Sequence, residues 1–231
     1  MSYGRFDHFR LLDTLRILPS EENGSTEPAL GIEHGGLQAA ESLLWARYFM
    51  YTQLYFHRVR RIYDIHLKDF LRAWLPGGKY SVALGDHLRM TDSEVLVALR
   101  NAAADPASAG HDPACRITQR KHFKRIYEKN TADDRKRNLR SVDLVTEALE
   151  AQFGAQAIRR DTYAQESTGI AFPVLSSDGR VEVSTAVSPT LSRVPTFQID
   201  YVFADPLIKD EALKWLDEHR DAILDKTPIE E

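Results

Sequence analysis

The feature that most constrains the fold of this sequence is a change in the spacing of its apolar residues near residue 153. Before that point apolar residues recur every three or four positions, which is the spacing of one face of an α-helix. After it come short runs rich in valine, isoleucine and phenylalanine, which are typical of β-strands, at residues 169–173, 181–185 and 197–203. The sequence therefore predicts a mainly α fold with a small α+β C-terminal lobe, divided into a helical region, 1–153, and the lobe, 154–231.

The helical region is expected to contain a small hairpin between its first two helices. A short helix is predicted over residues 6–16. Two short apolar runs, 15–18 and 29–32, flank a segment rich in Pro, Glu, Gly and Ser, which favours a turn between paired strands. Helical spacing then extends, with a bend, from Leu37 to Trp74, and Pro76-Gly77-Gly78 ends it.

Local signals place the remaining elements. Thr91 and Glu94 have the spacing of a capping box, so a helix is expected to start there. Residues 103–113 are rich in Ala, Pro, Gly, Ser and Asp and are predicted to form a surface loop. Helical spacing returns over 139–153, with Ser141 as the expected N-cap, and again over 206–224.

The composition fits a water-soluble globular protein. Hydrophobic residues make up 43% of the 231 positions and charged residues 28%, enough for a core and too mixed for a disordered or fibrous chain. The most apolar stretch, residues 43–54, is broken by Arg47 and Gln53 and falls short of the roughly 20 residues that span a bilayer. The first residues lack the pattern of a secretion signal, and Cys115 is the only cysteine. We therefore expect a cytoplasmic protein with no membrane partner.

The charge is unevenly distributed. Between Arg116 and Arg140 there are ten Lys or Arg residues against three Asp or Glu residues, so this segment is locally +7 although the whole chain carries −4. A concentrated positive field beside an acidic body indicates an anionic ligand, either nucleotide phosphates or a nucleic-acid backbone. The same pattern also fits a solvated helix face.

A guanidinium and two phenol rings are predicted to share one helix face. Arg47, Tyr51 and Tyr55 stand at positions i, i+4 and i+8 of the long helical pattern. Arginine presents a planar set of donors to phosphate, and tyrosine offers a flat apolar face to a sugar or a base. Aromatic residues at helical spacing are more often part of a core, so this pattern alone does not establish a site.

Several short motifs, taken in order, resemble one enzyme family. They are Tyr3-Gly4-Arg5-Phe6-Asp7, Ala39-Ala40-Glu41-Ser42-Leu43-Leu44, Ala46-Arg47, Tyr55-Phe56-His57, Arg120-Lys121-His122-Phe123-Lys124 and, more loosely, Asp161, Ser188 and Tyr201. The sequence resembles the region that follows the last metal-binding aspartate in HD-superfamily deoxynucleoside triphosphate (dNTP) triphosphohydrolases. Each motif is short, but they occur in order from residue 3 to residue 201, so the resemblance extends over nearly the whole chain.

The resemblance implies a fold, a reaction and roles for particular residues. The chain would be the helical part of an HD-domain phosphohydrolase, a family that uses a divalent metal to hydrolyse dNTPs to deoxynucleoside and triphosphate. By this resemblance Arg47 would contact the triphosphate and Tyr55 would pack against the deoxyribose. Tyr51, which helical spacing places on the same face, would line the same groove. Basic residues stand where the mammalian enzyme of the family binds regulatory nucleotides, namely Arg10, Arg58, Arg120 and Lys124. The same four residues also fit ordinary surface or subunit-interface charges. Glu33 and Gly35 replace basic residues there, which argues against the same nucleotide activation.

The metal-binding motifs of the resembled family are not found in this sequence. That family binds its metal through a His, an adjacent His-Asp pair and a distant Asp. His111-Asp112 has the right dipeptide, but it lies in the predicted loop without a second His and Asp around it. We therefore expect no catalytic residue, metal ligand or cofactor in this chain, and no hydrolysis by the chain alone.

Two interpretations of the function follow from the sequence. The chain either supplies substrate-contacting and assembly surfaces to a metal-dependent HD phosphohydrolase, or it is a catalytically inactive scaffold that binds nucleotides or single-stranded nucleic acid through residues 116–140. Self-association is expected in addition, because the apolar face of residues 37–54 is predicted to be partly uncovered.

Overall fold

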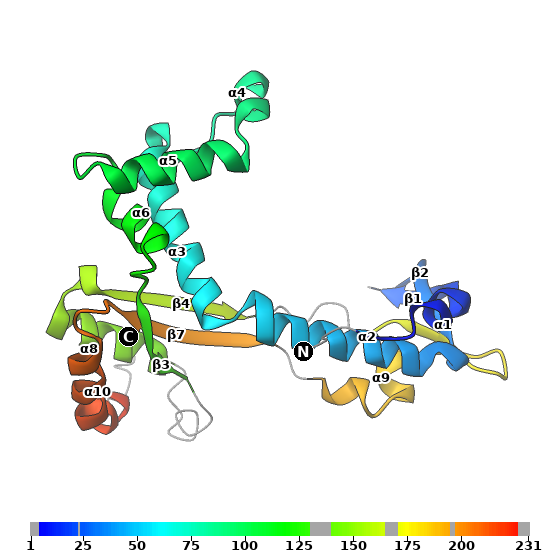
Figure 1. Ribbon diagram of the computed structural model, residues 1–231. Helices are drawn as coiled ribbons and strands as arrows, with labels where there is room; N and C mark the ends of the chain where they lie inside the picture. The colour runs from blue at the N-terminus through cyan, green and yellow to red at the C-terminus, as the bar shows by residue number, and fades with distance from the viewer. Residues whose placement is uncertain (1–4, 23, 130–139, 165–170, 195–196, 226–231) are drawn as a thin grey trace. The chain divides into compact units, whose positions relative to one another are not determined.

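The computed structural model describes residues 5–22, 24–129, 140–164, 171–194 and 197–225 (Figure 1). The chain divides into two compact units, and each is discontinuous in sequence. Unit 1 comprises residues 1–57 and 164–198, and unit 2 comprises residues 58–163 and 199–231. The predicted fold class is confirmed, since the described residues are mainly helical with small sheets. Within the described residues, no helix is both long and apolar enough to cross a bilayer.

Unit 1 combines helices with a four-stranded sheet. Its helices and short turns are α1 (His8–Thr14), η1 (His34–Gly36), α2 (Leu37–Met50), η2 (Tyr51–Tyr55), α9 (Ser184–Val187) and η5 (Leu191–Arg193). Its strands are β1 (Leu15–Glu22), β2 (Ser25–Glu33), β5 (Pro173–Leu175) and β6 (Val181–Val183), in the order β1-β2-β5-β6. The predicted hairpin is confirmed, because β1 pairs antiparallel with β2 and Leu15 lies opposite Ile32.

The core of unit 1 lies between α2 and the sheet. Ile32 and Val174 from the strands pack with Leu37 and Ala40 from α2. β2 and β5 run so close at Gly31 that an added Cβ would stand 2.3 Å from the Pro173 carbonyl oxygen. Self-association was expected through the apolar face of residues 37–54. Leu37 and Ala40, at the start of that face, are buried within unit 1.

Unit 2 contains a group of helices and a three-stranded sheet. The helices and short turns are α3 (Arg58–Trp74), η3 (Pro76–Gly78), α4 (Leu84–Arg89), α5 (Asp92–Ala104), α6 (His111–Thr118), α8 (Ser141–Phe153), η4 (Ala155–Ala157) and α10 (Lys209–Leu224). The strands are β3 (Lys124–Glu128), β4 (Ile158–Ala164) and β7 (Gln198–Ala204), in the order β3-β7-β4. The capping box at Thr91 and Glu94 is confirmed at the start of α5.

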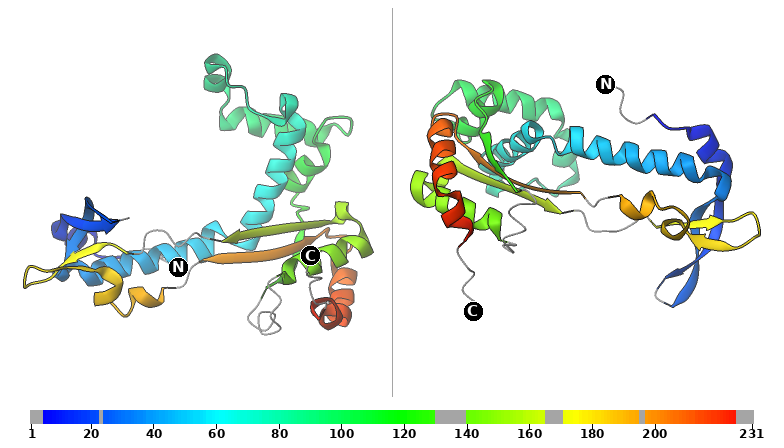
Figure 2. Two further views of the ribbon diagram at one scale, coloured as in Figure 1. Left: turned by 180° about the vertical axis from the view of Figure 1, so that it is seen from behind. Right: turned by 90° about the horizontal axis from the view of Figure 1, so that it is seen from below.

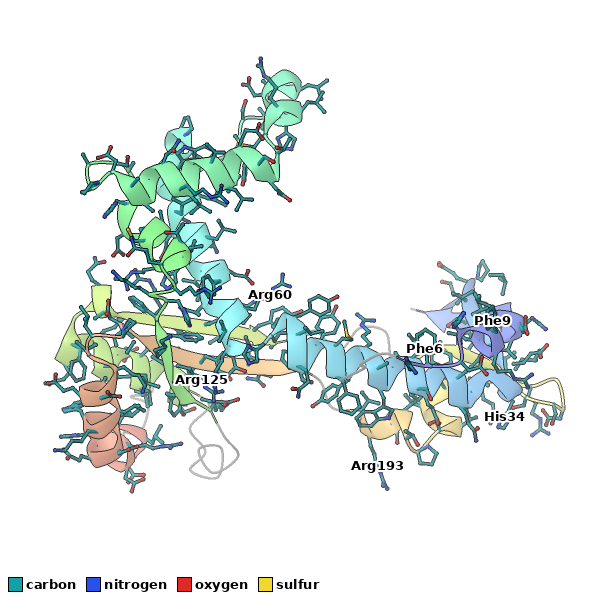
Figure 3. All side chains as sticks on the ribbon, in the orientation of Figure 1. Phe6, Phe9, His34, Arg60, Arg125 and Arg193 are labelled. Carbon is teal, nitrogen blue, oxygen red and sulfur yellow. The ribbon has the colours of Figure 1, made fainter. Side chains whose placement is uncertain are left out.

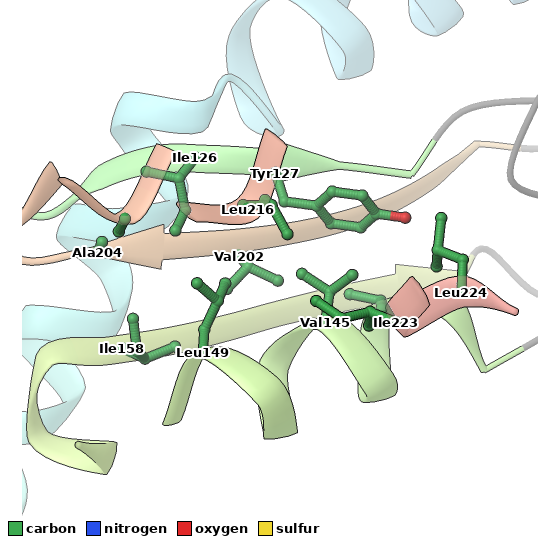
Figure 4. Packing of buried hydrophobic residues seen from close by; sticks show 12 residues of the cluster. Ile126, Tyr127, Val145, Leu149, Ile158, Val202, Ala204, Leu216, Ile223 and Leu224 are labelled. Atoms are coloured by element: carbon green, nitrogen blue, oxygen red, sulfur yellow. The ribbon is translucent and has the colours of Figure 1, made fainter. Parts of the chain in front are cut away.

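Both faces of the three-stranded sheet are covered. Val202 and Ala204 of β7 pack with residues of α8 and α10 in the larger core of the unit (Figures 2 and 4). Tyr201 and Phe203 alternate with them and are also buried. Helices α3, α5 and α6 form a second core around Phe70.

Four sequence-based expectations differ from the structure. Strands β3 and β4 were not predicted, because their partner β7 is remote in sequence and the charges of β3 obscure its pattern. The loop expected over 103–113 ends at Gly110, and α6 begins at His111. Ser141 is the first residue of α8, whose N-cap is Arg140. The single boundary expected near residue 153 differs from the division into two units, each of which draws on both sides of it.

Polar contacts along α3 hold the helix against the rest of unit 2. The Arg61 guanidinium donates to both oxygens of the Asp161 carboxylate on β4, at 2.7 and 2.6 Å. His66 Nε2 accepts a hydrogen bond of 3.2 Å from the backbone N–H of Phe123, just before β3. Burial, followed by the positive charge of Arg116, lowers the pKa of His66 from its ordinary 6.5 to about 4. His66 is therefore neutral at pH 7 and acts as an acceptor.

We expect His66 to make the stability of unit 2 sensitive to mild acid. The pKa of His66 is lower in the folded state, so the unfolded state binds the proton more tightly. Stability is complete above pH 6.5 and falls as the pH drops toward 4. When the pH is lowered from 7.5 to 5, this difference in pKa reduces the free energy of unfolding by about 2 kcal/mol. Urea denaturation of wild type, His66→Gln and the exposed control His87→Gln measures the effect. An unchanged pH dependence in His66→Gln would contradict this role.

The Arg61–Asp161 pair should be a large single contribution to the stability of unit 2. Asp161 is only 7% exposed, and Asp161→Asn removes the negative charge that accepts two hydrogen bonds from the Arg61 guanidinium. We expect a loss of about 3 kcal/mol in the free energy of unfolding. The matched control is Asp178→Asn, which breaks an exposed pair with Arg180 and should cost less than about 1 kcal/mol. Equal losses in both variants would show that the Arg61 pair is no more than a surface contact.

Candidate functional site

The single bent helix predicted over residues 37–74 is two helices in the structure, α2 and α3, and a π-helical turn, η2, ends the first. Helix α2 ends at Met50, and η2 continues it with a hydrogen bond of 2.9 Å from Phe56 N–H to the Tyr51 carbonyl oxygen. This i→i+5 bond widens the backbone, and such turns inside helices are frequent at functional sites. The turn contains neither Pro nor Gly, so the sequence predicted a bend without indicating its kind.

The structure brings the three predicted substrate residues together on one face. The Arg47 guanidinium carbon lies 5.4 Å from the centre of the Tyr51 ring. The Tyr51 and Tyr55 ring centres are 5.4 Å apart, with the rings inclined at 58°. Arg47 and Tyr55 are exposed, and Tyr51 between them is half-buried. We call these three residues the Arg47–Tyr55 face.

Buried aromatic rings support the Arg47–Tyr55 face from behind. Tyr51 stacks on Phe56 with ring centres 5.5 Å apart, and Phe56 stacks on Phe197 at 4.4 Å. Phe56 and Phe197 are both less than a tenth exposed. The sequence analysis did not single out Phe197 as part of this arrangement, because only the fold brings it to Phe56. The stack limits the freedom of the Tyr51 ring and leaves Arg47 and Tyr55 at the surface.

Within the part of the chain that the structure describes, Arg47 contacts an aromatic ring and no carboxylate. Among the described residues, no Asp or Glu side chain forms an ion pair with Arg47, whose guanidinium contacts the Tyr51 ring. An exposed guanidinium over a ring, without an anionic partner, is an arrangement that can take a phosphate or carboxylate group.

The residues predicted to bind regulatory nucleotides are divided between the two units. Arg10 belongs to unit 1, where its Nε donates to the Gly35 carbonyl oxygen at 3.0 Å. Arg58, Arg120 and Lys124 belong to unit 2. Arg120 has a positive φ of 58°, which is uncommon for a residue with a side chain.

Neighbouring side chains contact some of the residues that the family resemblance singled out. Lys124 Nζ lies 3.1 Å from His122 Nε2. Burial, and then the charge of Lys124, lowers the pKa of His122. Glu33, which stands where the resembled enzymes have a basic residue, forms an ion pair with Arg16 at 2.5 Å.

The basic segment from Arg116 to Arg140 lies partly outside the described residues, which omit 130–139. In its described part, several cations have structural partners. Arg116 pairs with Asp112 and Asp205. Arg125, labelled in Figure 3, lies on β3, and its guanidinium carbon is 5.3 Å from the centre of the Tyr201 ring. Arg120 and Lys121 are exposed. In the described part of the segment, not every cation is therefore available to a ligand.

The residues described here do not fit the metal site of the resembled enzymes. His111 Nδ1 lies 2.8 Å from the Ala102 carbonyl oxygen, and the Asp112 carboxylate accepts from Arg116 Nε at 2.7 Å. In the described ranges no three His, Cys, Asp or Glu side chains lie close enough together to hold a metal ion. His111 and Asp112 instead occupy the first turn of α6.

Comparisons with solved structures extend over most of the chain. A hypothetical protein from Aquifex aeolicus superposes with a TM-score of 0.75 at 29% identity, over 94% of this chain and 53% of that protein. A phosphohydrolase from Bacteroides thetaiotaomicron superposes with a TM-score of 0.56 at 16% identity, over 87% of this chain and 56% of that one. The second similarity shows a shared fold. The chain spans about half the length of both proteins.

Sequence comparison points to the same group of proteins. An uncharacterized protein of Bacillus subtilis, YwfO, is 37% identical over 71 residues, which cover 31% of this chain and 14% of YwfO. Residues 6–161, more than half of the chain, match the family model described as the HD associated region. This range includes the Arg47–Tyr55 face and most of unit 2. The chain therefore belongs to the HD-associated region family and is related to the HD superfamily.

Proposed function

We propose that this chain supplies substrate-contacting and assembly surfaces to a metal-dependent HD phosphohydrolase that acts on dNTPs. The reaction would release deoxynucleoside and inorganic triphosphate. The observation that carries the proposal is the Arg47–Tyr55 face, where an arginine with no carboxylate partner among the described residues lies beside two tyrosine rings. Family membership and the fold shared with a phosphohydrolase support the same reaction class.

Arg47 would bind the triphosphate. Its guanidinium can donate two parallel hydrogen bonds to phosphate oxygens, which a lysine cannot do. The Tyr51 ring lies under the guanidinium, and such a cation–π contact at an exposed site contributes about 0.5–1 kcal/mol. Tyr51 is itself fixed by Phe56, so Arg47 is partly ordered before any ligand arrives. Less conformational entropy is then lost on binding.

Tyr55 would contact the sugar. Its ring is 44% exposed and inclined toward the ring of Tyr51, so it offers both a flat face and an edge to a ligand. A ring packed against the 2′ carbon leaves no room for a 2′-hydroxyl. Discrimination against ribonucleotides would then arise from shape and from the cost of burying an unpaired hydroxyl.

The metal chemistry would come from residues outside those described here. The chain spans 53% and 56% of the two structures it matches. In this proposal the catalytic metal and its bound water are held by another part of a larger assembly. We expect no dNTP hydrolysis by this chain alone. A catalytically inactive module that binds nucleotides or single-stranded nucleic acid is the second candidate, supported by the exposed Arg120 and Lys121 in the basic segment.

Arg47→Ala should weaken dNTP binding by about tenfold to a hundredfold, because a charge-assisted hydrogen bond contributes roughly 1.5–3 kcal/mol. Arg47→Lys should recover only part of the loss. Arg193→Ala removes another exposed guanidinium from unit 1 and is the matched control. Calorimetric titration with dGTP measures the three affinities, and thermal melting checks the fold. An affinity of Arg47→Ala equal to that of the control would refute the phosphate contact.

Tyr55→Ala should change sugar selectivity more than overall affinity. We expect the ratio of dGTP to GTP affinity to fall severalfold, about the effect of one lost apolar contact of 1 kcal/mol. Tyr55→Phe keeps the ring and should keep the ratio. If Tyr55 instead only supports the fold, both affinities and the melting temperature fall together in Tyr55→Ala.

Salt dependence distinguishes the two candidate functions. Binding of a single-stranded oligonucleotide should weaken steeply with salt if the basic segment holds a nucleic-acid backbone. A compact nucleotide site should in addition prefer deoxyribose. Tight oligonucleotide binding that is insensitive to Arg47→Ala, without measurable dNTP binding, would favour the second candidate.

A further inference from the structure

The exposed apolar side chains of unit 2 gather on one short stretch. Among the described residues of this unit, six of the nine large apolar side chains that are exposed lie between residues 80 and 97. They are Tyr80, Val82, Leu84, Leu88, Leu96 and Val97. Monomeric proteins rarely leave so concentrated an apolar surface in contact with water, and such surfaces mark interaction sites.

Helix α4 has no core of its own. Every residue from Lys79 to Arg89 is exposed in the described structure, and Figure 1 shows α4 beyond the end of α5 that is farther from α6. Leu84 and Leu88 lie on one helix face, and each is 73% exposed. A helix of only six residues is marginal in water, because helices shorter than about 12–15 residues rarely form alone. We call residues 79–90 the arm, and its apolar face requires a partner.

An apolar groove of about 560 Å³ lies along α5, the helix that follows the arm in sequence. Trp74, Val97 and Ala98 supply apolar walls, and Glu94 and Asn101 supply polar atoms. No residue of the arm is among the described residues that line the groove. The unit therefore displays two apolar surfaces, a convex arm and a concave groove, and neither covers the other.

The charges of the arm and the groove are complementary. The arm carries Arg89, and the groove carries Glu94, with Asp92 beside it at the start of α5. Arg89 forms an ion pair with Asp86 in which both side chains are more than half exposed. A pair of that kind contributes about 0–1 kcal/mol, so Arg89 can exchange it for a carboxylate across an interface.

We propose that the arm of one chain docks in the groove of a second copy, and that the second copy returns the same contact. Leu84 and Leu88 enter the groove, and Arg89 faces the carboxylate of Glu94. A two-fold axis makes such a contact self-complementary, because one unit carries both halves. This is the observation that favours a second copy over an unrelated protein. The inference requires no nucleotide and stands independently of the proposed function.

Light scattering coupled to size-exclusion chromatography tests the proposal. The wild-type chain of 26.3 kDa should elute at twice that mass, and the double variant Leu84→Asp/Leu88→Asp should elute as a monomer. Leu207→Asp is the matched control, since Leu207 is a 93% exposed leucine of unit 2 outside the arm, and it should remain dimeric. A wild-type monomer at high concentration, or a double variant with unchanged mass, would overturn the proposal.

Mixing two defective variants tests whether the arm of one copy binds the groove of the other. Asn101→Trp fills the groove at an exposed position of α5 while leaving the arm intact, and it should also be monomeric by itself. Mixed with Leu84→Asp/Leu88→Asp, it still offers one intact arm to one intact groove, so a weak heterodimer should form. Circular dichroism verifies that both variants are folded. The absence of a heterodimer between two folded monomers would show that arm and groove do not bind each other.

Discussion

Unit 2 depends on helix α3 being held to its sheet by polar groups that have lost most of their contact with water. Arg61 donates two hydrogen bonds to the carboxylate of Asp161, in an ion pair in which Asp161 is almost completely buried. Further along the helix, neutral His66 accepts from the backbone at Phe123, and Asp69 pairs with Arg159 at 3.4 Å. A buried carboxylate without its arginine would be costly, so these contacts specify one position of α3 as much as they stabilise it.

Contacts around Phe123, next to α3, hold one cation of the described basic segment in the fold. The Phe123 ring is buried, with the Arg116 guanidinium 4.3 Å and the Arg159 guanidinium 5.4 Å from its centre. Each of these arginines also pairs with an aspartate. Arg116, which counted toward the predicted binding surface, is therefore held by structural contacts. The Arg47–Tyr55 face differs, because its arginine has a ring beneath it and no described carboxylate beside it.

Local signals in the sequence predicted elements well, and partners remote in sequence were harder to predict. The hairpin of β1 and β2, the capping box of α5 and the helical spacing that forms α2 and α3 were predicted because turn residues and apolar spacing act over a few residues. Strands β3 and β4 were missed because each is stabilised through β7. Helical spacing placed Arg47, Tyr51 and Tyr55 on one face. Only the fold brings Phe197 behind them, since no local pattern links it to Phe56.

The central claim is that the Arg47–Tyr55 face contacts a deoxynucleoside triphosphate. The most direct measurement is a crystal structure of the protein soaked or grown with a non-hydrolysable dGTP analogue. The account predicts triphosphate oxygens within hydrogen-bond distance of the Arg47 guanidinium and the deoxyribose against the Tyr55 ring. Analogue bound at full occupancy elsewhere, with Arg47 and Tyr55 still facing water, would contradict it.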